Sequence, residues 1–109
     1  MKIALDYDDT FTLEPALWLN FILAFQLHGH EVRIVTMRSP EHDRTPDIVA
    51  LERHAPVIYT NGGAKRAHCE QVGWVPDVWI DDNPAAILAP STTSNEVLAA
   101  WRAQREQTI

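Results

Sequence analysis

Residues 3–10 read IALDYDDT, a short apolar run that ends in a group of carboxylates. The apolar residues lack the polar alternation of a half-exposed strand, which is typical of a strand that is buried on both faces. The residues after them are acidic and turn-prone, so we expect the strand to stop at Asp6, at an exposed edge of a sheet. This stretch predicts a buried strand with charged side chains at its carboxyl end.

Further along the chain, short apolar segments of the same kind alternate with helical patterns. We expect strands over residues 31–36, 56–60 and 77–81, helices over residues 15–28, 47–54 and 64–72, a very short fifth strand at residues 87–89, and a terminal helix capped by Ser94 or Asn95. Gly29 suits a left-handed stop for the first helix. This alternation predicts an α/β fold, a parallel sheet of four or five strands with helices on both faces.

Size and charge limit the possible classes of protein. The chain has 109 residues, the size of one domain, and 46% of them are hydrophobic, enough for a core. The formal net charge of −6 repels nucleic acid, anionic lipid and phosphate esters, so phosphate chemistry would need a local cation. The single cysteine, Cys69, excludes an intrachain disulfide and favours a reducing compartment. The N-terminus does not resemble a signal peptide and the apolar runs are short, so we expect a soluble, cytoplasmic protein.

Polar and charged residues collect at the predicted carboxyl ends of the strands. They are Asp6, Asp8 and Asp9 after the first strand, Thr36 after the second, Lys65 beyond the turn after the third, and Asp81 and Asp82 after the fourth. These ends meet at one edge of a parallel sheet, so we expect the side chains to lie close together. Crowded carboxylates repel one another unless a divalent cation lies between them or one takes up a proton. A ligand set made only of oxygens favours Mg²⁺.

The same residues, in the same order, resemble the four motifs of the haloacid dehalogenase-like (HAD) phosphohydrolases. Residues 3–10 resemble the first motif, an apolar run followed by D-x-D-x-T, and residues 32–36 resemble the second, an apolar strand that ends in Thr or Ser. Lys65 is similar to the lysine of the third motif, and residues 80–82 are similar to the acidic fourth motif. The resemblance covers the whole chain. It implies a three-layer, Rossmann-like fold and a Mg²⁺-dependent phosphatase that acts through an aspartyl-phosphate.

The resemblance also implies a role for each of these residues. Asp6 would be the nucleophile, because a carboxylate is already ionised at neutral pH. Asp8 would protonate the leaving oxygen and then take a proton from the hydrolytic water, which needs a carboxyl group with a raised pKa. Thr36 would bind the transferring phosphoryl group. Lys65 would neutralise the Asp6 carboxylate and the charge that develops on the phosphoryl group.

The implied Mg²⁺ ligands are Asp6, the backbone carbonyl of Asp8 and the acids of the fourth motif. Of these acids, Asp82 is the first choice as a direct ligand and Asp81 would support it. Two positions depart from the family pattern. Asp9 stands where many members have glycine, and it is either an outer ligand of the metal or a solvated side chain. Thr12 stands where an apolar residue is more usual.

The spacing of the motifs leaves no room for a cap domain, either between residues 10 and 32 or between residues 36 and 65. We therefore expect one catalytic domain over residues 1–109 with an open site. Such a site would accept a phosphorylated small molecule, a nucleotide or the end of a polymer. Arg38 and Arg66 are candidates for binding phosphate or substrate, because a guanidinium matches phosphate oxygens, and they are equally well explained as solvated surface arginines.

Other readings of the chain stay open. A phosphotransferase would share the intermediate, and a catalytically silent protein could keep the metal and phosphate site. A receiver-like signalling module also combines acids, Thr and Lys, but it would need an aspartate at the end of the third predicted strand, where residues 57–60 contain none. The first helix is apolar around much of its circumference, more than a small domain can cover, so we expect a homodimer through this helix.

Overall fold

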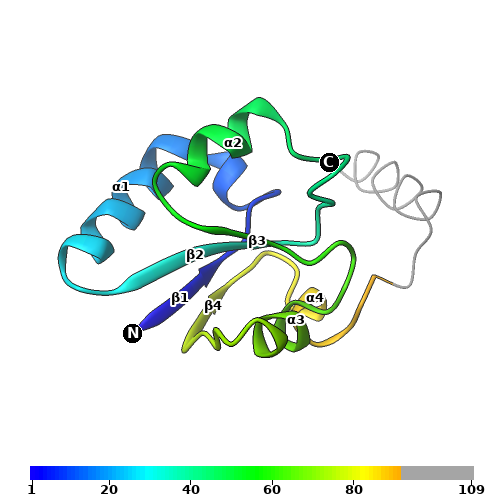
Figure 1. Ribbon diagram of the computed structural model, residues 1–109. Helices are drawn as coiled ribbons and strands as arrows, with labels where there is room; N and C mark the ends of the chain where they lie inside the picture. Colours follow the sequence, from blue (N-terminus) through cyan, green and yellow to red (C-terminus); the bar gives the residue numbers. More distant parts are fainter. Residues whose placement is uncertain (92–109) are drawn as a thin grey trace.

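The computed structural model describes residues 1–91, in which strands alternate with helices (Figure 1). The strands are β1 (Lys2–Leu5), β2 (Glu31–Thr36), β3 (Val57–Tyr59) and β4 (Val78–Ile80). The helices are α1 (Pro15–Leu27), α2 (Pro46–Glu52), α3 (Lys65–Gln71) and α4 (Ala85–Leu88), with a 3-10 turn η1 (Phe11–Leu13) before α1. The first four predicted strands and the first three predicted helices are confirmed, with ends that differ by no more than two residues.

The strands of residues 1–91 form one parallel sheet in the order β3-β2-β1-β4. Leu5 of the central strand β1 lies opposite Ile34 of β2 and Ile80 of β4. The chain first adds β2 and β3 on one side of β1 and then crosses to add β4 on the other side. The strand order therefore reverses beside β1, and the carboxyl ends of β1 and β4 are neighbours. Such a switch point is where ligands bind in α/β sheets.

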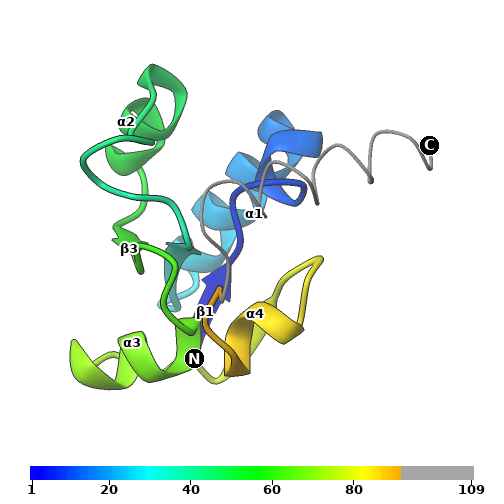
Figure 2. The ribbon, with the colours of Figure 1, turned by 90° about the vertical axis from the view of Figure 1, so that its right-hand side faces the viewer.

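Helices lie on both faces of the sheet (Figures 1 and 2). Alternate residues of β1 point to opposite faces, as in any strand. Ile3 and Leu5 belong to the cluster of buried side chains that also includes Ile22 of α1 and Ile48 of α2. Ala4 belongs to a second cluster, with Cys69 of α3. Residues 1–91 therefore have the expected α/β class, with an all-parallel sheet of four strands.

Helix α1 buries one side only. It ends before Gly29, whose φ of 85° is the left-handed conformation predicted for the stop. Ile22 is the one fully buried side chain of this helix, and Leu17, Leu23 and Leu27 are exposed. Residues 1–91 thus leave part of the apolar surface of α1 uncovered, and the pairing of two chains through this helix stays a prediction.

The predicted fifth strand at residues 87–89 is wrong. Residues Ala85–Leu88 form the helix α4, which packs beside α3, and the amide of Ala89 donates to the carbonyl of Ala85 at 3.0 Å. An apolar run of three residues cannot by itself distinguish a strand from a buried helical turn, and alanine and leucine are the strongest helix formers. The predicted terminal helix with Ser94 or Asn95 as its cap lies outside the described residues.

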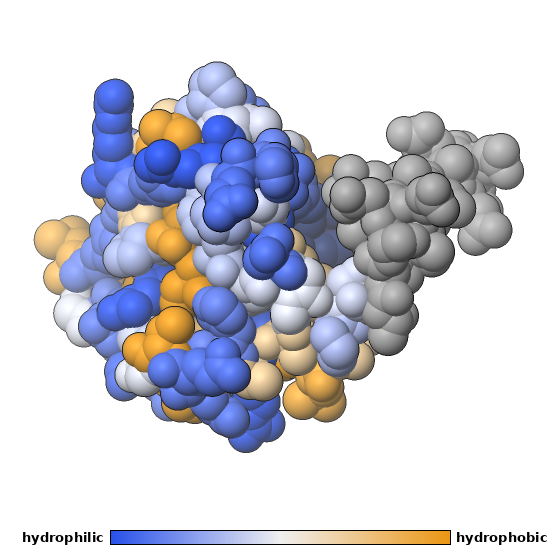
Figure 3. Space-filling view, turned by 45° about the vertical axis from the view of Figure 1, so that its right-hand side comes forward, coloured by the Kyte–Doolittle hydropathy of each residue, from blue (hydrophilic) through white to orange (hydrophobic). Residues whose placement is uncertain are grey.

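The surface is mostly hydrophilic on the side that Figure 3 shows, where the hydrophobic patches are small and separated. Among residues 1–91, no helix combines the length and the apolar character that a membrane span requires.

Candidate active site

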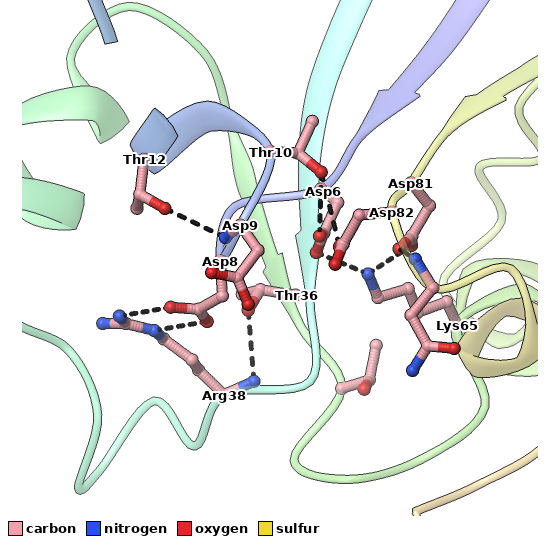
Figure 4. A network of polar contacts seen from close by, with 12 residues as sticks. Asp6, Asp8, Asp9, Thr10, Thr12, Thr36, Arg38, Lys65, Asp81 and Asp82 are labelled. Atoms are coloured by element: carbon pink, nitrogen blue, oxygen red, sulfur yellow. Dashed lines mark hydrogen bonds and ion pairs between the residues drawn. The ribbon is translucent and has the colours of Figure 1, made fainter. Parts of the chain in front are cut away.

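The carboxyl ends of β1 and β4 and the first turn of α3 bring four charged side chains together. They are Asp6, Lys65, Asp81 and Asp82, which we call the Asp6 cluster (Figure 4). One carboxylate oxygen from each of the three aspartates lies within 4.8 Å of the others. Asp6 directly follows β1, and its amide continues the ladder by donating to the carbonyl of Ile80 at 2.9 Å. Of the acids that the sequence analysis expected to lie close together, Asp6, Asp81 and Asp82 do so.

Lys65 is the buried cation of the cluster. Its Nζ donates to Oδ1 of Asp6 at 2.7 Å and to Oδ2 of Asp81 at 2.6 Å, and the residue is only 2% exposed. A tight turn before α3 brings it there: the amide of Gly63 donates to the carbonyl of Thr60 at 3.0 Å. A Cβ on Gly63 would lie 3.1 Å from that same oxygen, which is a tight contact. Glycine, which has no Cβ, therefore fits this turn best.

Thr10 links two of the carboxylates, a role that the sequence interpretation did not give it. Its hydroxyl lies 3.2 Å from Oδ2 of Asp6 and 3.4 Å from Oδ1 of Asp82, and it can donate its single hydrogen to either. The backbone turn supports this position, because the amide of Phe11 donates to the carbonyl of Asp6 at 3.4 Å. The threonine of D-x-D-x-T was the available signal, since it is the one hydroxyl fixed at this spacing from Asp6.

Burial raises the pKa of Asp6 to about 7. The ammonium of Lys65 acts in the opposite direction, and the hydrogen bond with Asp82 and the charge of Asp81 raise the pKa further. Three carboxylates thus lie near one ammonium. Without a further cation, this arrangement favours the protonated form of Asp6. Such a set of oxygen ligands, short of positive charge, could hold a divalent metal ion. Asp6, Asp81 and Asp82 are the residues that could hold it.

Asp8 and Arg38 form an ion pair instead of joining the Asp6 cluster. Nε and Nη2 of Arg38 donate to the two carboxylate oxygens of Asp8 at 2.9 and 2.7 Å. Nη1 donates to the carbonyl of Asp43 at 2.9 Å and to Oγ1 of Thr45 at 3.1 Å. The guanidinium also lies over the ring of Tyr7, 4.8 Å from its centroid. The hydrogen bonds to Asp8 raise the pKa of Arg38 above its usual value.

Thr36 lies at the end of β2 and is almost fully buried. Its Oγ1 accepts a hydrogen bond from the amide of Arg38 at 3.2 Å. In Figure 4 the Asp8–Arg38 pair is drawn to the left and the Asp6 cluster to the right, with Thr36 between them. Arg66, the other arginine considered for phosphate binding, has a side chain that is 57% exposed and lies 3.4 Å from Glu70.

The two departures from the family pattern contact each other. Asp9 has a φ of 61°, in the left-handed region that favours glycine and that aspartate tolerates better than most residues. Its amide donates to Oγ1 of Thr12 at 2.9 Å. The hydroxyl of Thr12 thus supports the backbone conformation that Asp9 adopts in place of glycine, and this bond requires a polar residue at position 12.

Comparisons with known proteins add no assignment to this geometry. A scan against family models, a search of curated proteins and a search of solved structures each found no match to the chain.

Proposed function

We propose that the chain is a Mg²⁺-dependent phosphohydrolase with a Rossmann-like, HAD-like three-layer fold, which hydrolyses a phosphomonoester through an aspartyl-phosphate. The observation that supports this most is the buried contact of Lys65 with both Asp6 and Asp81, at the switch point of the sheet. A buried carboxylate beside a fixed ammonium can approach a phosphate dianion with less repulsion than a solvated one. The substrate class is a phosphorylated small molecule, a nucleotide or a polymer end.

In the first step, an Asp6 carboxylate oxygen forms a bond to phosphorus. The bond from phosphorus to the leaving oxygen breaks, and its electron pair departs with that oxygen, to which Asp8 would give a proton. Lys65 keeps the Asp6 carboxylate in place and balances charge on the phosphoryl oxygens, while Asp81 holds Lys65 from the other side. The hydroxyl of Thr36 would bind the phosphoryl group during transfer.

In the second step, a water oxygen forms a bond to phosphorus and gives a proton to ionised Asp8. The bond between phosphorus and the Asp6 oxygen breaks, which restores the Asp6 carboxylate and releases inorganic phosphate. Asp6, Asp81 and Asp82 would hold Mg²⁺, together with the backbone carbonyl of Asp8 that the family resemblance implies. The bound ion would supply positive charge that favours ionised Asp6 and screens the phosphate oxygens.

The test is phosphate release by the full chain from p-nitrophenyl phosphate with Mg²⁺. We expect turnover that a chelator abolishes, and the variant Asp6→Asn should lower it by at least about 1000-fold because it removes the nucleophile. Asp77→Asn is the matched control, because the Asp77 carboxylate accepts from the amide of Lys2 at the opposite edge of the sheet, at 2.7 Å. This control should keep wild-type turnover.

Two outcomes contradict the proposal in different ways. Full activity in Asp6→Asn would show that another residue is the nucleophile. Stabilisation of the chain by Mg²⁺ without release of phosphate from any ester would favour the alternative, a catalytically silent protein that binds metal and phosphate.

A further inference from the structure

Arg38 uses its side-chain donors within the protein. Nε and Nη2 pair with Asp8, and Nη1 donates to the carbonyl of Asp43 and the hydroxyl of Thr45. The flat face of the guanidinium lies over the ring of Tyr7. An arginine that served mainly to bind phosphate would direct its fork toward the Asp6 cluster, whereas this fork is directed at a carboxylate.

The loop after β2 holds Arg38 in this orientation. Oδ2 of Asp43 accepts from the amide of Ser39 at 2.9 Å, which closes the loop on itself. Arg44 pairs with Glu52 of α2, and the hydroxyl of Tyr59 donates to the same carboxylate at 2.6 Å. The loop is thus tied to α2 and to the end of β3, so its position does not depend on Asp8.

The Asp8 side chain would otherwise have considerable freedom. It is 43% exposed, and a carboxylate on the surface samples several rotamers unless a partner fixes it. A two-pronged contact with a guanidinium fixes both the direction and the plane of the carboxylate, which a single point charge does not. An ionised carboxylate in a fixed orientation is the form that accepts a proton from water.

We infer that Arg38 is the positioning residue for Asp8 and that it serves the hydrolysis of the aspartyl-phosphate rather than the binding of phosphate. The inference rests on the proposed function. In the step concerned, the water O–H bond breaks, its proton goes to a carboxylate oxygen of Asp8, and the water oxygen forms the bond to phosphorus. The bond from phosphorus to Asp6 breaks, and Asp6 keeps the electron pair.

This role separates the two half-reactions for p-nitrophenyl phosphate. Nitrophenolate leaves without a proton, so formation of the aspartyl-phosphate does not need Asp8, whereas its hydrolysis does. Loss of the two-pronged contact between Arg38 and Asp8 should therefore slow only the hydrolysis of the aspartyl-phosphate. A residue that bound the phosphate of the substrate would affect the first half, because kcat/KM reports all steps up to the first irreversible one.

The experiment compares Arg38→Met and Arg38→Lys with the wild-type chain, using p-nitrophenyl phosphate and Mg²⁺. We expect kcat to fall by about 10- to 100-fold in both variants, because misplacing a catalytic group costs rates of this order. We expect kcat/KM to change by less than about threefold, since formation of the aspartyl-phosphate is intact. The intact mass after an acid quench should show a larger fraction of phosphorylated chain than in the wild type.

Arg53→Met is the matched control. It removes an exposed arginine at the end of α2, and it should leave kcat and the phosphorylated fraction unchanged. Should Arg38→Met fail to fold, Arg38→Lys carries the same test, because lysine keeps the charge without the fork.

Several results would overturn the inference. An equal fall of kcat/KM and kcat in the Arg38 variants, with no extra phosphorylated chain, would leave the phosphatase proposal standing and make Arg38 a phosphate-binding residue. Wild-type kinetics in Arg38→Lys would mean that charge alone matters. A wild-type chain that releases no nitrophenolate would contradict the proposed function, and the inference would fall with it.

Discussion

At the scale of single residues, Lys65 decides whether the buried carboxylates of Asp6 and Asp81 can coexist beside the exposed Asp82. Its ammonium contacts Asp6 and Asp81, and the side chains of Lys65, Asp6 and Asp81 are nearly inaccessible to water. The raised pKa of Asp6 shows that the compensation is incomplete, because burial outweighs the effect of the ammonium. The cluster therefore has a cost for folding, and buried groups with strongly shifted pKa values are candidates for a functional site.

Replacing Lys65 by methionine should destabilise the protein by about 3 kcal/mol at neutral pH, because a buried charge pair loses one partner. A carboxyl group whose pKa is raised in the folded state makes the protein less stable as the pH rises through that pKa. Without Lys65 the folded-state pKa of Asp6 would be higher still. The loss should hence be greater at pH 8 than at pH 5. Urea unfolding of chelator-treated protein at both pH values measures it.

Arg66→Met is the control for this measurement. Arg66 is the next residue of the same helix, and its ion pair with Glu70 is exposed on both sides. Exposed pairs of this kind contribute little, so the variant should unfold at the wild-type urea concentration at both pH values. Equal unfolding of Lys65→Met and Arg66→Met would contradict the description of Lys65 as a buried structural cation.

The sequence was sufficient to place Asp6, Asp81 and Asp82 at one edge of the sheet, but not to predict the Asp8–Arg38 pair. These acids follow β1 and β4, and the carboxyl ends of parallel strands share one edge whatever the side chains do. The partner of Asp8 depends on the rotamer of Arg38, which the loop through Asp43 and Thr45 sets. No local pattern encodes that loop conformation.

At the scale of elements, α1 shows how one helix can be strongly apolar and yet only half covered. Ile22 is 0% exposed and belongs to the main core cluster, whereas Leu27 is 85% exposed. Ile22→Ala should cost about 3 kcal/mol because it leaves a cavity. Leu27→Ala should change the free energy of unfolding by less than about 0.5 kcal/mol. Urea unfolding of the two variants, each compared with the wild type, checks both values.

A large effect of Leu27→Ala in dilute solution would mean that this side chain is covered by something that residues 1–91 do not provide. The comparison thus also tests the packing of α1 independently of the site.

Among the elements, long periodic segments such as residues 15–28 were predicted well because many residues agree on one period. The three residues 87–89 were not, since packing beside α3 decides their conformation.

At the scale of the whole molecule, the crossing of the chain from β3 to β4 creates the site. Had β4 been added beside β3, two strands would separate Asp81 from Asp6, which are now on neighbouring strands. The alternation of strands and helices predicts a parallel sheet, but it does not fix the order of the strands. That order depends on which face each helix covers, and so on the fit of the side chains in the two core clusters.

The uncovered side of α1 leads to the last prediction, which concerns the assembly of the molecule. Leu23 and Leu27 are one helical turn apart and both exposed, so they lie on one face. Two chains that pair through this face would remove these leucines from water, and we expect light scattering to give a mass that rises toward a dimer with concentration. The double variant Leu23→Glu, Leu27→Glu should stay monomeric, because pairing would then bury like charges. Leu88→Glu is the control, since Leu88 is equally apolar and exposed but belongs to α4. A monomeric wild-type mass at every concentration, or a dimer that survives the double variant, would contradict pairing through α1.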